Sequence, residues 1–498
     1  MGGAQHLGQA GDRGAAACFR GDTEDMNRER AETYLRQLAE AELRRARTLP
    51  AASIPARRDT ARLALVAQAL LAVGAIDVGT ADQIRADLEL AVAVRQPSQV
   101  NQASPGQRGL SPDARMRLAR LMRSSRGAGT GVLPVSSLST GQARAAPPRA
   151  SWRAVPVGQM IQVRDDDVRR ELLVVAYVQS ADGARFTTAG WPFRPFRPFT
   201  AADDRGASYQ IRFLGEMRPR ELPLSPDPPY RIRWLDLITA PGEPATRIDL
   251  DPQIPAPQVT MTRKATSPGE LMLDIIAARI LTWGTALPQD HPEHSAAAHA
   301  NLQAFVSDGP GRVVAALRAA GALPPASPVP GQLAALCDRL GIPGHGITEP
   351  PAAGLPEPWQ SLLTRPRRRT PPAGPASGIS AATMVELPGL DGAQIAILGL
   401  HHGHGGTIVH MLASGVTREG DWEYARGVRP LPVLWIRDSG GRWHATRTDG
   451  VSPMWGDTRE IMVWLAIVPP LDRGTAWIDV VATGSSAQVR ARLPLSWE

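Results

Sequence analysis

The spacing of apolar positions changes several times along the chain. Residues 26–96 and 259–365 repeat their apolar positions every three or four residues, which is typical of amphipathic helices. Residues 151–258 and 384–498 carry short alternating or continuous apolar runs between Gly, Pro and Asp, which predict strands and turns. This order predicts an α+β multi-domain chain, with an N-terminal helical module and a second helical module between two β-rich domains.

The two β-rich stretches match each other near their ends. Trp234-Leu235-Asp236-Leu237 in the first has its counterpart in Trp477-Ile478-Asp479-Val480 in the second. The match predicts an internal duplication. Asp236 and Asp479 recur two residues after their tryptophans, on the same face of the strand. A matched acid in both copies indicates a structural hydrogen-bond acceptor rather than a catalytic pair.

A second match concerns a turn and sets the expected alignment of the two copies. Asp204-Arg205-Gly206 precedes Tyr209 as Asp438-Ser439-Gly440 precedes Trp443. With about seven strands per copy and a turn roughly every 8–15 residues, each copy predicts an antiparallel β-sandwich, immunoglobulin-like in outline. The run 461–468 is apolar at every position and predicts a central strand that is covered on both faces.

Helix signals begin both helical modules. Asn27 is a predicted N-cap, and Ser267-Pro268-Gly269-Glu270 combines an N-cap, a proline at the first helical position and a glutamate at the third. Cys337 falls on an apolar helical face, which predicts a buried, inert thiol.

Three segments lack a core-forming pattern. Residues 1–25 predict a disordered extension, with Met26 as the expected native start, and residues 97–150 and 366–383 predict linkers rich in Arg and Pro. The first linker includes a short basic amphipathic helix at 115–126. Its arginines, which include Arg115, Arg120 and Arg123, suit nucleic acid, an anionic membrane surface or an acidic protein face, but a solvated spacer is the favoured interpretation.

Composition adds little to the functional picture. The chain has 55 Lys and Arg residues, of which Lys264 is the only lysine, and a formal net charge of +7. We interpret this uniform use of arginine as coding bias. The two cysteines permit no disulfide framework, and no apolar run reaches the roughly 20 residues that span a bilayer. These features favour a cytoplasmic chain.

Histidines gather at one predicted hairpin. If Gly405-Gly406 forms a two-residue turn, His401 lies directly opposite His410 and the two imidazoles are close enough to share a metal. His444, on another strand, is a candidate third ligand. The first copy has no histidines, which favours ordinary hairpin residues instead. The sequence predicts no cofactor, and a transition metal is the alternative; its candidate ligands are His401, His402, His404, His410 and His444.

A period-three segment is the second candidate. Polyproline II has three residues per turn, so the run from Trp191 to Phe199 places its phenylalanines along one edge and its arginines along another. This pattern suits a partner-binding ridge, but the favoured interpretation is a loop whose rings fold back over an open end of the first β domain. The residues of the ridge are Phe193, Arg194, Phe196, Arg197 and Phe199.

The chain resembles uncharacterised proteins of high-GC bacteria, in the stretches 34–43, 176–186, 234–249 and 330–337. The resemblance implies no activity. Phosphate loops, nucleophile elbows, zinc-protease motifs and calcium loops do not occur in the sequence. The leading hypothesis is therefore a cytoplasmic, multi-domain interaction protein without a catalytic site. The alternatives are a metal-binding enzyme or sensor that uses the histidine hairpin, and an adaptor for nucleic acid or an anionic surface that uses the basic helix.

Overall fold

The computed structural model describes a large part of the chain, in segments. The described residues are 27–41, 44, 63, 65–76, 80, 152–165, 168–180, 183–189, 199–211, 221–229, 231–239, 244–251, 257–283, 309–342, 344–364, 379–381, 384–391, 393–403, 406–414, 434–451 and 460–496.

The first β unit is one antiparallel sheet in the order β1-β2-β3-β6-β5-β4-β7-β8. Strand β6 pairs with β3 on one side and β5 on the other, so it joins the two halves of the sheet. The first and last strands of this sheet are linked by a side chain. The Arg153 guanidinium in β1 donates to the carbonyl oxygens of Ile232, just before β7 (3.1 Å), and Leu250, just after β8 (2.6 Å). The strands are β1 (Arg153–Asp165), β2 (Val168–Ser180), β3 (Gly183–Ala189), β4 (Phe199–Asp203), β5 (Ser208–Ile211), β6 (Glu221–Ser225), β7 (Trp234–Ile238) and β8 (Thr246–Asp249).

The second β unit repeats this order and adds strands at its margins. Its path runs β10-β12-β13-β16-β15-β14-β17-β18-β9, and β11 also pairs with β12. Counted from β11 to β18, the strands follow each other as β1 to β8 do. The strands are β9 (Gln258–Arg263), β10 (Ile379–Ala381), β11 (Val385–Leu390), β12 (Ala393–Gly403), β13 (Gly406–Ser414), β14 (Leu434–Asp438), β15 (Trp443–Val451), β16 (Glu460–Val468), β17 (Trp477–Thr483) and β18 (Ala487–Pro494).

The α+β class with two antiparallel β units is confirmed, but the immunoglobulin-like sandwich is not. Each unit is a single hydrogen-bonded path that curls nearly into a barrel. In the second unit the Ser485 amide donates to Asp391 at 2.6 Å, which ties the turn after β11 to the turn between β17 and β18. Strand β16 is central, as predicted, and both of its faces are buried.

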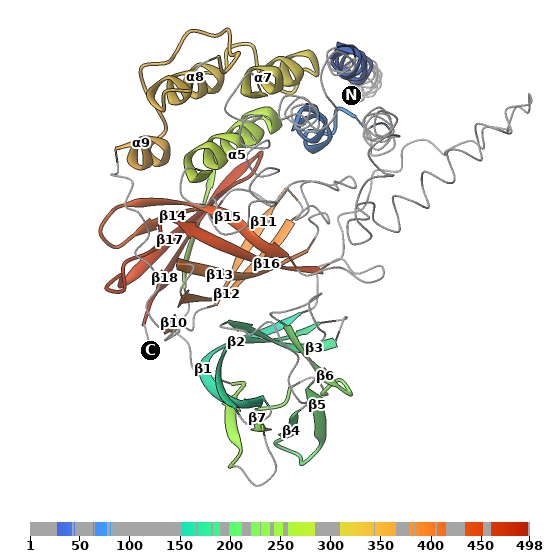
Figure 1. The fold of residues 1–498 in the computed structure, drawn as a ribbon, viewed down its shortest axis with the longest axis vertical. Coiled ribbons are helices and arrows are strands. Elements are labelled where there is room, and N and C mark those ends of the chain that lie inside the picture. The colour runs from blue at the N-terminus through green and yellow to red at the C-terminus, as the bar shows by residue number, and fades with distance from the viewer. Residues whose placement is uncertain are drawn as a thin grey trace, which may run out of the picture.

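The helices form one layer on the second unit (Figure 1). Residues of the N-terminal helices share a core with α5 (Pro268–Trp283), α7 (Gly309–Ala319), α8 (Val329–Arg339) and α9 (Glu357–Leu363). Trp435 and Trp443 of the second unit belong to the same core, and Cys337 is fully buried in it. The predicted start of α5 is confirmed: the Ser267 amide donates to Glu270 at 2.9 Å, and the Glu270 amide donates to the Ser267 hydroxyl at 3.2 Å. Within the described residues, no helix is both long and apolar enough to cross a membrane.

The helical module predicted at 259–365 begins with a strand, so its predicted boundary is wrong. Residues 258–263 form β9, which pairs with β18 of the second unit and leads into α5. The alternation of Val259 and Met261 with Thr260 and Thr262 has the period of a strand, which explains this outcome.

The two β units are packed against each other through outward-facing apolar side chains. Ala176 and Val178 of β2 lie in one buried cluster with residues of β12, β13 and β16, among them Leu398 and Ile408. At the margin, the Trp152 indole donates to Glu386 at 3.1 Å. In Figure 1 the second unit accordingly lies between the helical layer and the first unit.

Candidate functional site

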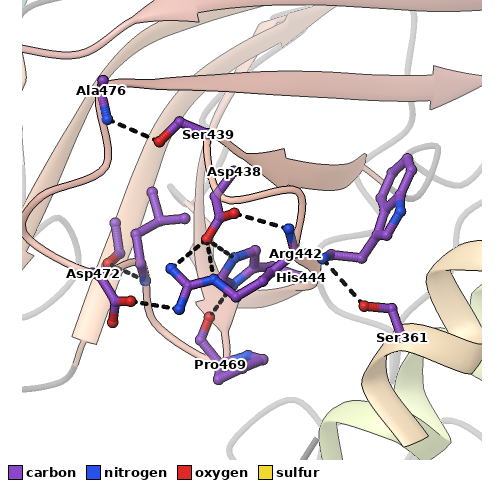
Figure 2. Close-up of polar contacts among 11 residues, drawn as sticks. Ser361, Asp438, Ser439, Arg442, His444, Pro469, Asp472 and Ala476 are labelled. Carbon is purple, nitrogen blue, oxygen red and sulfur yellow. Dashed lines mark hydrogen bonds and ion pairs between the residues drawn. The ribbon is translucent and has the colours of Figure 1, made fainter. Parts of the chain in front are cut away.

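A cluster of polar side chains surrounds the turn between β14 and β15 (Figure 2). The backbone closes the turn, because the Asp438 amide donates to the Arg442 carbonyl and the Gly441 amide donates to the Asp438 carbonyl, both at 2.9 Å. Gly441 has a φ of 77°, a conformation that favours glycine. The Arg442 amide donates to Asp438 Oδ1 at 2.9 Å, so the carboxylate caps its own turn.

Asp438 Oδ2 is the hub of the side-chain contacts. It accepts from Arg442 Nε at 2.7 Å and lies 3.3 Å from His444 Nε2, while both Asp438 and His444 are fully buried. His444 Nδ1 lies 2.6 Å from the Pro469 carbonyl oxygen, which can only accept. Both ring nitrogens therefore face acceptors, an arrangement that suits the doubly protonated imidazole. Arg442 also pairs with Asp472 at 2.6 Å, which ties the turn to the loop after β16.

The charge balance of this cluster favours the ionised carboxylate. Burial by itself raises the pKa of Asp438, but the hydrogen bonds from Arg442 and His444 outweigh burial and hold that pKa below its usual range. Arg442 and Asp472 face the solvent, with 42% and 60% of their side chains exposed. The ring nitrogens of His444 are both engaged, so the ring is not placed as a general base.

The first β unit has the same turn, with Tyr209 in place of His444 and Ala207 in place of Arg442. Asp203 Oδ1 accepts from the amides of Arg205 and Ala207, both at 2.9 Å, and Asp203 Oδ2 accepts from the Tyr209 hydroxyl at 2.6 Å. Asp203 therefore corresponds to Asp438, and Tyr209 corresponds to His444. The sequence alignment that matched Asp204 with Asp438 is wrong by one residue. Because a turn-capping aspartate occurs in both units, we assign the cluster a structural role rather than a catalytic one.

A second matched arrangement lies on the last two strands of each unit. In the first unit Arg247 binds Asp236 through two bonds, at 2.8 and 2.9 Å, and its guanidinium lies 4.7 Å from the Trp234 ring. In the second unit Arg492 binds Asp479 in the same way, at 2.8 and 3.0 Å, and lies 3.9 Å from the Trp477 ring. The prediction that the repeated aspartates are structural hydrogen-bond acceptors is confirmed.

The histidine hairpin has a different register from the one predicted. Gly403 pairs with Gly406, so His401 lies opposite Ile408, and His410 lies opposite Gly399. The rings still meet diagonally, with His401 Nδ1 and His410 Nε2 2.8 Å apart. Both histidines are buried. They lie on the same face of the hairpin as Ile408, which packs in the cluster between the two β units.

The structure does not assemble the other candidate metal ligands around this pair. His402 Nδ1 contacts the Thr407 hydroxyl at 2.9 Å, and burial followed by the nearby charge of Arg473 lowers the pKa of His402. His444 belongs to the turn cluster, and His404 lies outside the described residues. Within the part of the chain that the structure describes, no three His, Cys, Asp or Glu side chains are grouped to hold a metal ion.

The candidate partner-binding residues are mostly outside the described part of the chain. This holds for Arg115, Arg120, Arg123, Phe193, Arg194, Phe196 and Arg197, and for the helix predicted at 115–126. Phe199 is described as the first residue of β4, and it is 2% exposed in the core of the first unit. The prediction of an exposed anchor is wrong for Phe199, because its strand turns the ring inward.

Sequence reasoning missed the exposed strand β9. All six of its residues are exposed, with Val259 at 37% and Met261 at 56%. It pairs with β18 on one side and is the last strand on the described path of the sheet. Its alternation of Val and Met with Thr was the available signal, but six residues next to a strong helix start are easily assigned to the helical module that follows.

Comparison of the chain with protein families, with curated proteins and with solved structures finds no match.

Proposed function

We propose that this chain is a cytoplasmic binding protein that takes up an extended strand of another polypeptide along the free edge of β9. The observation that carries the proposal is a regular strand at the end of a ten-stranded sheet with every side chain exposed. Such an edge offers unpaired amide and carbonyl groups to an incoming strand. The buried free thiol of Cys337 suits a reducing compartment.

The direction of the backbone groups follows from the strand that β9 already pairs with. Directly after β9, the Lys264 amide donates to the Ser486 carbonyl at 3.0 Å. Backbone groups alternate in direction along a strand, so the even-numbered residues of β9 point toward β18. The amide and carbonyl groups of Val259, Met261 and Arg263 then point away from the sheet, toward the position of an added strand.

The side chains of β9 supply an apolar face for that strand to cover. Met261 lies opposite Val489 and Val259 lies opposite Ala491, and both β18 residues face the core of the second unit. Opposite residues share a face, so Val259 and Met261 continue the core side of the sheet beyond β18. Their exposure marks an apolar strip next to backbone groups that pair with no other described strand, a combination that strand addition buries.

Strand β9 is held in place by β18 along its length and by the segment that leads into α5. A strand that is already ordered loses less conformational entropy when a partner binds. Strand β9 pairs with β18 over its whole length, and Thr266 adds a backbone bond to Ser485 at 2.9 Å before α5 begins. Helix α5 is fixed in turn by its capping box and by the helical core.

Affinity capture with variant baits tests the proposal. Met261→Pro removes an outward amide that makes no bond to β18, so it blocks strand addition while leaving the ladder to β18 intact. Met160→Lys, which alters another exposed apolar residue, on the first unit, is the control. We expect a partner that wild type and Met160→Lys both retain, that Met261→Pro loses, and that cross-links to β9. A partner retained by all three baits would refute the proposal.

A further inference from the structure

We propose that the strand taken up by β9 is β9 of a second copy of this chain, paired antiparallel about a twofold axis. The inference rests on the proposed function and names its partner. It follows from the self-complementary order of residues in Gln258–Arg263.

The symmetry of such a pair agrees with the direction of the backbone groups. A twofold axis perpendicular to the sheet keeps each face on its own side, so odd-numbered residues of one copy lie opposite odd-numbered residues of the other. The outward amide and carbonyl groups belong to the same odd-numbered residues. Val259 of one copy then exchanges two backbone hydrogen bonds with Met261 of the other, and the reciprocal pair adds two more.

The side chains agree with the same register. Val259 lies opposite Met261 twice, which places four apolar side chains on one face of the joined sheet, and Thr260 lies opposite itself at the axis. Arg263 lies opposite Pro257, whose ring has no amide hydrogen, so the pairing ends there. The two Arg263 side chains are at opposite ends of the junction, and like charges do not meet.

The expected dimer is weak, because one short strand per copy forms its core. Interfaces of this kind belong to the small end of the range, below about 1,200 Å². We expect a dissociation constant of roughly 1–100 μM, and therefore a mass that depends on protein concentration.

Sedimentation velocity of the full chain from about 1 μM to several hundred μM, a range that spans this constant, measures the association. We expect wild type and Met160→Lys to approach twice the monomer mass at the highest concentration. Met261→Lys, which places two ammonium groups within the apolar strip of the joined sheet, is expected to stay monomeric. A wild-type chain that is monomeric throughout, or a Met261→Lys variant that associates like wild type, would overturn the inference.

A cysteine placed at the axis tests the register. In the proposed pairing the two Thr260 residues form a non-hydrogen-bonded pair with Cα atoms about 4.5 Å apart, within the range of a disulfide. Thr260→Cys in a Cys18→Ser background should give a covalent dimer on mild oxidation, because Cys337 is fully buried. Met261→Cys in the same background should cross-link less. The reverse order of yields would refute this register.

The two proposals can fail separately. A monomeric chain whose captured partner is lost on Met261→Pro would refute self-pairing and leave strand addition standing. A chain for which Met261→Pro changes neither the mass nor the captured proteins would refute both.

Discussion

Tyr209 and His444 occupy the same place in the two β units, and each contacts the buried aspartate six residues before it. Tyr209 donates its hydroxyl to Asp203 at 2.6 Å, and His444 lies 3.3 Å from Asp438. One unit thus supports the turn-capping carboxylate with a phenol, and the other supports it with an imidazole and Arg442. The equal strand order and these equal contacts support the internal duplication, which stays a prediction.

Removal of the phenolic hydroxyl tests the first of these contacts. Tyr209→Phe deletes the O–H donor and leaves the ring in the core, so we expect the free energy of unfolding to fall by about 1.5–3 kcal/mol, the range for a bond to a charged group. Urea denaturation measures this change. Tyr34→Phe is the control, because the Tyr34 hydroxyl reaches the Arg312 carbonyl only at 3.4 Å in a half-buried site. Equal losses in the two variants would contradict the assigned role.

The second contact predicts a dependence of stability on pH. The pKa of Asp438 is held below its usual range, so its contribution is fully present above the pKa of an unfolded aspartate, about 3.9. The contribution is lost as the pH falls through the lower folded value. We expect denaturation midpoints measured between pH 6 and about pH 2 to fall less steeply for Asp438→Asn than for wild type. Asp251→Asn, an exposed control, should follow the wild-type slope.

Local patterns in the sequence predict local structure well here. The capping box at Ser267 and Glu270 is correct because both partners lie within one helical turn. The apolar run of β16 is correct because burial on both faces needs no knowledge of the neighbouring strands. The repeated Trp-x-Asp pattern correctly indicated a structural acceptor.

Long-range closure and exact register were not predictable in the same way. The near-barrel form depends on contacts such as Arg153 with Leu250 and Asp391 with Ser485, which join residues about a hundred positions apart. The histidine hairpin turns one residue earlier than its glycines indicated, which moves His401 from direct to diagonal contact with His410. A shift by a single residue is invisible to composition, but it decides which side chains meet.

The burial of Phe199 predicts a loss of stability rather than a loss of partner binding. The ring lies in the core of the first unit with Ile211, its cross-strand partner on β5. Phe199→Ala removes a buried ring and leaves a cavity, so we expect unfolding to become easier by about 3–5 kcal/mol. Thermal or urea denaturation measures this. Phe199→Leu is the milder comparison, and an unchanged midpoint in both variants would show that the ring is not buried.

Asp274 joins the helical layer to the second unit, and this predicts where local opening occurs. The carboxylate of this α5 residue accepts from the Trp359 indole of α9 at 2.9 Å and from the Trp435 indole of β14 at 2.8 Å. Burial raises the pKa of Asp274, and the two indole bonds offset part of that rise. Each bond therefore stabilises a carboxylate that is otherwise costly to bury, by about 1.5–3 kcal/mol.

Trp359→Phe and Trp435→Phe each remove one of these indole donors. The first removes the bond between α9 and Asp274, and the second removes the bond between β14 and Asp274. We expect Trp359→Phe to speed hydrogen exchange of the α9 amides by about 10-fold or more, since 1.4 kcal/mol of local stability corresponds to a factor of ten. Trp435→Phe should leave α9 protected, because the bond from Trp359 to Asp274 persists. Exchange mass spectrometry on peptides covering Glu357–Leu363 separates the two outcomes. Equal acceleration of α9 in both variants would mean that Asp274 does not hold the two elements independently.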